Sequence, residues 1–165
     1  MSLQVDIQSA TAEPVPDEDD IRRWIAAALA RIATFAGAGR QDAEICVRLV
    51  DADEMATLNA TYRDRAGPTN VLSFPAALPA ELKLPLLGDI VICAPVVRAE
   101  AAAQQKSLQA HWAHMAVHGT LHLLGYDHIE EADATAMEAL ESAILAELHY
   151  PCPYRGETTE EHSLR

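Results

Sequence analysis

The chain has 165 residues, of which 50% are hydrophobic and only 5% aromatic, and its formal net charge is −13. This length favours one domain that can bury a core. The charge argues against a general nucleic-acid binder, because neutralising phosphates requires clustered Lys and Arg side chains. No apolar run approaches the roughly 20 residues that a membrane span needs.

The first residues carry neither the basic flank nor the apolar core of a signal peptide. The three cysteines are widely spaced and form no CxxC pair, which argues against a disulfide framework and against a thiolate metal site: Cys46, Cys93 and Cys152. We therefore expect a cytoplasmic protein without a membrane partner.

The charge is unevenly distributed along the chain. Residues 111–165 contain ten Asp and Glu against two Arg, whereas residues 40–110 contain nine acids against seven bases. We expect an anionic substrate to meet the protein in this nearly neutral middle stretch, although most of these charges are ordinary solvated side chains.

Hydrophobic periodicity predicts the order strand, helix, strand, helix, two strands and three helices. The expected strands span residues 3–8, 44–50, 69–74 and 86–93. The first expected helix begins at residue 17 and ends at Gly37 or Gly39. The other expected helices span residues 53–62, 95–106, 108–124 and 133–149. Tyr62 is expected to face inward from the second helix. These elements predict an α+β fold in which about five helices cover a small four-stranded mixed sheet. We place a single domain at residues 1–154 and a polar C-terminal tail at residues 155–165.

A row of histidines carries the strongest chemical signal. His114, His118 and His122 follow at intervals of four residues, so they lie along one face of a helix. A zinc ion holds imidazole nitrogens at roughly 2.0–2.1 Å, whereas the rise between the first and the last of these residues is about 12 Å. One ion can therefore bind the first pair or the second pair, but not all three.

A third histidine favours the second pair. Gly125 can adopt the left-handed conformation that ends a helix, and the chain can then return so that His128 approaches His122. This arrangement gives three nitrogen ligands and an open fourth position, which is the layout of a catalytic zinc. We predict one Zn²⁺ per chain on His118, His122 and His128. A helix with surface histidines is the alternative, and we expect His111 and His114 to form hydrogen-bonded contacts or a groove wall.

The spacing resembles the metzincin protease signature HExxHxxGxxH at every position but one. The glutamate that serves as general base in that signature is Gly119 here, and a glycine cannot accept a proton. A helical glycine also costs about 1 kcal/mol relative to alanine. Two explanations remain open and are compatible: close packing against a neighbouring strand, or space for a bulky substrate near the metal.

Three segments resemble the YbeY family of bacterial endoribonucleases, which act in rRNA maturation. They are HGTLHLLGYDH at 118–128, LNATYR at 58–63 with PTNVLSFP at 68–75, and LGDIVI at 87–92. The resemblance runs from about residue 45 to Tyr154. It implies a metal-dependent endoribonuclease specific for single strands, acting on the 16S rRNA precursor and in ribosome quality control, with ribosomal subunits as partners. It also implies a small sheet wrapped by helices and zinc on the three matching histidines.

The family's functionally important arginine falls on Arg63, so Arg63 and His118 are the expected catalytic residues. Arg63 can hold a phosphate through two parallel hydrogen bonds, whereas the alternative is a surface ion pair with Asp64. Asp127 can orient the His128 imidazole or cap the turn. The general base stays open between a second metal-activated water and the 2′-hydroxyl of the RNA.

Two other functions compete with this one. A non-catalytic ribosome assembly factor would use zinc only for stability, and a metalloprotease is weakened by Gly119. The negative charge also suggests a basic ribosomal protein as a partner.

Overall fold

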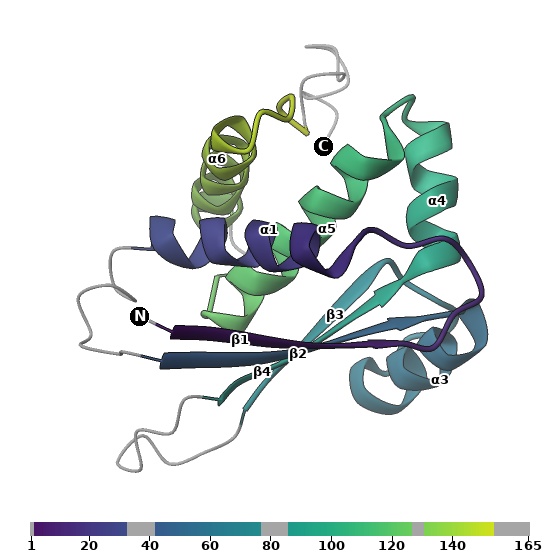
Figure 1. Ribbon diagram of the computed structural model, residues 1–165. Helices are drawn as coiled ribbons and strands as arrows, with labels where there is room; N and C mark the ends of the chain where they lie inside the picture. The colour runs from purple at the N-terminus through teal and green to yellow at the C-terminus, as the bar shows by residue number, and fades with distance from the viewer. Residues whose placement is uncertain (1, 33–41, 77–85, 127–130, 154–165) are drawn as a thin grey trace.

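The predicted order of strands and helices is confirmed by a computed structural model (Figure 1), which describes residues 2–32, 42–76, 86–126 and 131–153. The elements are β1 (Ser2–Ser9), α1 (Glu18–Arg31), β2 (Asp42–Val50), α3 (Ala52–Arg63), β3 (Val71–Pro75), β4 (Leu86–Cys93), α4 (Ala94–Ala103), α5 (Leu108–Leu123) and α6 (Glu131–Glu147). The polar tail at residues 155–165 lies outside the described residues. Within the described ranges, no helix combines the length and the apolar character needed to cross a membrane.

One mixed sheet organises the chain, as expected for an α+β protein. The strand order is β1-β2-β4-β3. β1, β2 and β4 run parallel, and β3 runs antiparallel to β4. β3 therefore forms one edge of the sheet, and its Ser73 lies opposite Ile90.

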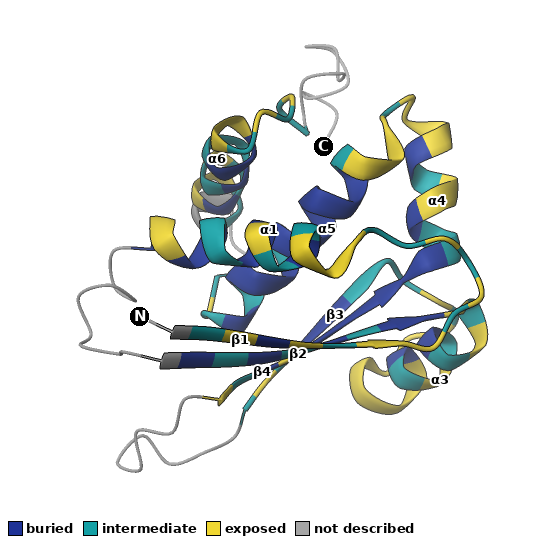
Figure 2. Ribbon diagram, in the orientation of Figure 1, coloured by how far each residue is buried: buried dark blue, intermediate teal, exposed yellow. Residues whose placement is uncertain are grey.

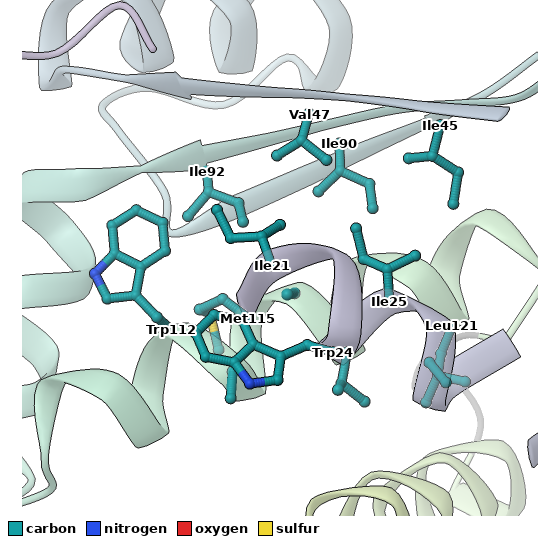
Figure 3. Close-up of a cluster of buried hydrophobic side chains, with 14 of the residues drawn as sticks. Ile21, Trp24, Ile25, Ile45, Val47, Ile90, Ile92, Trp112, Met115 and Leu121 are labelled. Atoms are coloured by element: carbon teal, nitrogen blue, oxygen red, sulfur yellow. The ribbon is translucent and has the colours of Figure 1, made fainter. Parts of the chain in front are cut away.

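The two faces of the sheet are covered by different helices. Side chains alternate along β4, so Ile90 and Ile92 face the large core formed with α1 and α5. Figure 3 shows these two residues pointing toward Ile21, which α1 contributes. Val91 and Cys93 face the opposite way and form a smaller core with Met55 of α3. In Figure 1, α3 accordingly lies on the other side of the sheet from α1 and α5.

α5 is the central helix of the larger layer. It packs against β3, β4, α1, α4 and α6, and Figure 2 shows it buried over most of its length. The Ser107 hydroxyl begins the helix by accepting a hydrogen bond from the backbone N–H of Ala110 at 3.0 Å, which satisfies one of the free donors at a helix N-terminus. The histidine row is thus fixed on a rigid, enclosed element.

Two expectations about helices were wrong. α1 ends at Arg31 rather than at Gly37 or Gly39, because Ile32 takes an extended backbone conformation while its side chain stays buried. Tyr62 does not face inward: it is 61% exposed, and its ring meets the Phe74 ring edge-on at 5.4 Å between centroids. The core beneath α3 is too small to include the last turn of that helix.

Gly119 lets α5 approach the sheet closely. A Cβ atom at this position would lie 2.8 Å from Cγ2 of Ile90 and 3.3 Å from both Oγ of Ser73 and Cγ2 of Val71. The Ser73 hydroxyl also donates to the Gly119 carbonyl at 2.8 Å. The close-packing explanation of this glycine is confirmed, and the position faces the sheet.

We predict that Gly119→Ala destabilises the protein although alanine is the better helix former. Overpacking a core costs about 1–3 kcal/mol, and the gain in helix propensity offsets only about 1 kcal/mol of it. The expected net loss, up to about 2 kcal/mol, can be measured by urea unfolding. Ile90→Ala removes the Cγ2 atom that a Cβ at position 119 would meet. Gly119→Ala should therefore lower the free energy of unfolding less in the Ile90→Ala variant than in the wild-type protein. An equal cost on both backgrounds would contradict this packing.

Candidate metal centre

The described histidines of α5 form a continuous row, as their spacing predicts. Neighbouring ring centroids are 6.0 Å apart for His111 and His114, 6.1 Å for His114 and His118, and 4.6 Å for His118 and His122. The side chains of His111 and His114 are buried, whereas His118 and His122 are partly exposed. The row therefore runs from the interior toward solvent.

His118 and His122 present nitrogen atoms to each other. Their Nε2 atoms are 3.1 Å apart. Two imidazole nitrogens bound to one tetrahedral zinc would be separated by about 3.3 Å, since each bond is roughly 2.0–2.1 Å long. The donor atoms and their spacing thus fit a zinc-like ion.

A buried carboxylate lies on the other side of His118. One oxygen of Glu141 in α6, Oε2, lies 2.6 Å from Nε2 of His114 and 3.0 Å from Nδ1 of His118. Burial raises the pKa of this carboxyl, but hydrogen bonds from the two histidines outweigh that effect and lower it to about 2. Glu141 is therefore ionised at neutral pH, and both histidines must donate to it.

Two sets of side chains in this region could hold a metal ion. His114, His118 and Glu141 have ligand atoms within 4.8 Å of one another. The second set joins His118 to His122 through their Nε2 atoms. His118 belongs to both sets: its Nδ1 faces Glu141 and its Nε2 faces His122.

The end of α5 has the geometry expected from Gly125. This residue has a positive φ of 97°. Its N–H donates to the carbonyl of His122 at 3.0 Å, and the N–H of Tyr126 donates to the carbonyl of Leu121 at 3.1 Å. These two bonds form a Schellman motif, which reverses the chain after a helix. His128 and Asp127 lie outside the described residues.

Arg63 occupies the last position of α3, beside the edge strand. Its Nη2 atom donates to the carbonyl of Ser73 at 2.6 Å, and its Cζ atom lies 5.2 Å from the centre of the Phe74 ring. In the described part of the chain Arg63 takes part in no ion pair, so the pair with Asp64 is not formed. Among the described residues, no carboxylate therefore neutralises the Arg63 charge.

Ser73 connects Arg63 to the histidine helix. Its backbone carbonyl accepts from Arg63, and its hydroxyl donates to the carbonyl of Gly119, the residue after His118. Ser73 therefore links Arg63 to the backbone of α5 at Gly119.

The buried histidines form hydrogen-bonded contacts, as predicted. His111 Nε2 lies 2.9 Å from Oε1 of Glu100, and burial lowers its pKa despite that bond. His114 bonds to Glu141.

Sequence reasoning missed Glu141. A signal was present, because Glu141 lies on the same face of α6 as Met137, Ile144 and Leu145, which are buried as expected. A single acidic residue within an apolar stripe indicates a buried partner that carries a positive charge or donates a hydrogen bond.

Comparison with known proteins identifies the family. The sequence model described as Endoribonuclease YbeY matches residues 4–149. An Endoribonuclease YbeY from Pseudomonas putida (strain W619) is 52% identical over 159 residues, which cover 96% of this chain and 97% of that protein. The protein of the same name from Cellvibrio japonicus (strain Ueda107) is 51% identical over 152 residues, which cover 92% of this chain and 82% of that protein.

A solved structure supports the fold. The solution structure of TM1509 from Thermotoga maritima matches with a TM-score of 0.54 and 22% identity, covering 88% of this chain and 92% of that one. At this identity the likeness concerns the fold alone, whereas the sequence matches over almost the whole chain concern the family. The chain belongs to the YbeY family of endoribonucleases.

Proposed function

We propose that this protein is a metal-dependent endoribonuclease that cleaves single-stranded RNA. The family supports an endoribonuclease role. The observation that carries the metal dependence is the pair of Nε2 atoms of His118 and His122, which face each other at 3.1 Å on a partly exposed part of α5.

The proposed metal is one Zn²⁺ per chain, held by His118, His122 and His128. Access to substrate favours this set over the one that includes Glu141. The Glu141 side chain is 1% exposed, against 19% for His118, and an ion held at the carboxylate would be enclosed between α5 and α6. A catalytic site needs a coordination position that a substrate can reach.

When bound, a zinc ion supplies Lewis acidity, which polarises a phosphoryl oxygen and acidifies water. The protein's own contribution begins with Arg63. Its guanidinium gives one N–H to Ser73 and has further donors left for phosphate oxygens. Phe74 supports the guanidinium plane through a cation–π contact. Held in this way, Arg63 stabilises the negative charge that builds up on the phosphate.

The natural substrate we propose is the 16S rRNA precursor, met within ribosomal subunits in the cytoplasm. The net charge of −13 opposes indiscriminate RNA binding. It suits a basic ribosomal protein as the partner that brings enzyme and RNA together.

A metalloprotease is disfavoured by the position of Gly119. This residue faces β3 and β4, and a side chain there would collide with Ile90 before it could act as a base. A non-catalytic assembly factor with a structural zinc remains the competing function, and only an activity measurement separates it from the nuclease.

We expect the metal-loaded protein to cut a short single-stranded RNA and to leave casein intact. A chelator should stop cleavage, because the phosphoryl group then loses its Lewis acid, and added zinc should restore it. Zinc-loaded protein that leaves RNA intact would favour the assembly factor. Casein hydrolysis that is lost with the chelator and in His122→Ala would favour the protease.

Metal content distinguishes the two ligand sets. Elemental analysis after dialysis should give about one zinc per chain. His122→Ala and His128→Ala should empty the site because each removes one of three ligands, whereas His114→Ala should leave it occupied. Loss of zinc in His114→Ala with retention in His128→Ala would assign the metal to the buried set.

Arg63→Glu should reduce the rate of RNA cleavage on the order of 100-fold or more, since removing one donor from a developing negative charge has this effect in other enzymes. Arg63→Lys should recover only part of the rate, because an ammonium group cannot form the two-pronged contact. Zinc content and melting temperature should stay near wild type.

Arg65→Glu is the matched control, because Arg65 is exposed two residues after Arg63, in the loop that follows α3, and carries the same charge. Rates are compared at fixed salt, since phosphate contacts weaken as salt rises. Equal losses at Arg63 and Arg65 would indicate general electrostatics rather than a phosphate clamp.

A further inference from the structure

Glu141 is an unusual residue for the interior of this protein. Among the residues whose burial is described, it is the one buried acid. A carboxylate out of water is costly unless hydrogen bonds replace its hydration. Its buried neighbours on the same face of α6 are apolar: Met137, Ile144 and Leu145.

The compensation comes from two histidines of α5. Oε2 of Glu141 receives both contacts, from Nε2 of His114 at 2.6 Å and from Nδ1 of His118 at 3.0 Å. An ionised carboxylate has no hydrogen to give, so the hydrogen in each bond belongs to the imidazole. His118 therefore carries its hydrogen on Nδ1.

This placement of the hydrogen matters for the opposite side of the ring. A neutral imidazole has one N–H and one lone pair, so a hydrogen on Nδ1 leaves the lone pair on Nε2, which faces His122. Free histidine prefers the other tautomer, with the hydrogen on Nε2. Without a partner at Nδ1, His118 would direct an N–H at the position where a metal must bind.

We propose that Glu141 is a positioning residue that holds His118 in the Nδ1–H tautomer and so directs the Nε2 lone pair to the metal shared with His122. The proposal rests on the metal site proposed above. It explains why a charged residue is kept inside the α5–α6 interface. A carboxylate behind a metal-bound histidine fixes the ring orientation and makes the ligand more basic.

The geometry favours positioning over direct coordination. His118 cannot bind one metal through both ring nitrogens, because they lie on opposite sides of the ring. The distance of 2.6 Å between Nε2 of His114 and Oε2 is a short charge-assisted hydrogen bond, and it is shorter than the spacing of about 3.3 Å that two ligands of one tetrahedral ion adopt. His114 thereby orients the carboxylate that orients His118.

The first test measures the tautomer in wild-type protein. Long-range ¹H–¹⁵N NMR of the metal-free protein, at a pH where the histidines are neutral, assigns the hydrogen of His118 to one nitrogen. We expect Nδ1–H. Observation of Nε2–H would overturn the proposal, and this result needs no variant to fold.

The second test measures zinc affinity by competition with a chelator, in the absence of RNA. Glu141→Leu keeps side-chain volume but removes the acceptor, and should weaken zinc binding about 10–100-fold and shift His118 toward Nε2–H. Glu141→Gln keeps a carbonyl oxygen and should restore part of the affinity. Glu138→Gln removes a charge from the same helix and should change neither reading.

The outcomes separate this proposal from the function on which it rests. Wild-type protein that binds no zinc would refute the metal site itself. Tight binding in wild type with equal affinity in Glu141→Leu would refute only the positioning role. Complete loss of zinc in both Glu141 variants and in His114→Ala would make Glu141 a ligand instead.

Discussion

The placement of α5 between the sheet and α6 is the constraint on which the rest of the structure depends. One side of the helix approaches β3 and β4 closely enough that only glycine fits at position 119. The neighbouring side carries His118 toward Glu141 of α6. A shift of α5 by a fraction of its pitch would break both contacts together. The position of α5 that packs the core is therefore also the position that aligns the candidate ligands.

Charge imposes a second requirement on any account of RNA cleavage by this protein. A net charge of −13 repels the RNA backbone, so favourable contacts must be local. Arg63 meets this requirement, because the Ser73 carbonyl and the Phe74 ring hold its guanidinium at the sheet edge, where it forms no ion pair with a described residue. Ser73 also bonds to α5, so the cation and the histidine row share one support. This arrangement suits an enzyme that depends on a partner for general affinity and on a few residues for chemistry.

The sequence allowed most of the fold and part of the site to be predicted, for identifiable reasons. Strong periodicity predicted the element order, and Gly125 correctly indicated the left-handed end of α5. Tyr62 was placed wrongly, because its helical spacing says nothing about how far the core beneath α3 extends. Glu141 was missed because its partners lie 23 and 27 residues earlier and meet it only through tertiary packing. The return of His128 stays a prediction, since it lies outside the described residues.

The claim that most needs testing is that the metal lies between His118 and His122 rather than between His118 and Glu141. Anomalous diffraction at the zinc edge, from a crystal of the zinc-loaded protein, would locate the ion directly. We predict a single peak within roughly 2.0–2.1 Å of both Nε2 atoms, with Glu141 still bonded to Nδ1 of His118. A peak within bonding distance of the Glu141 carboxylate and His114 would contradict it.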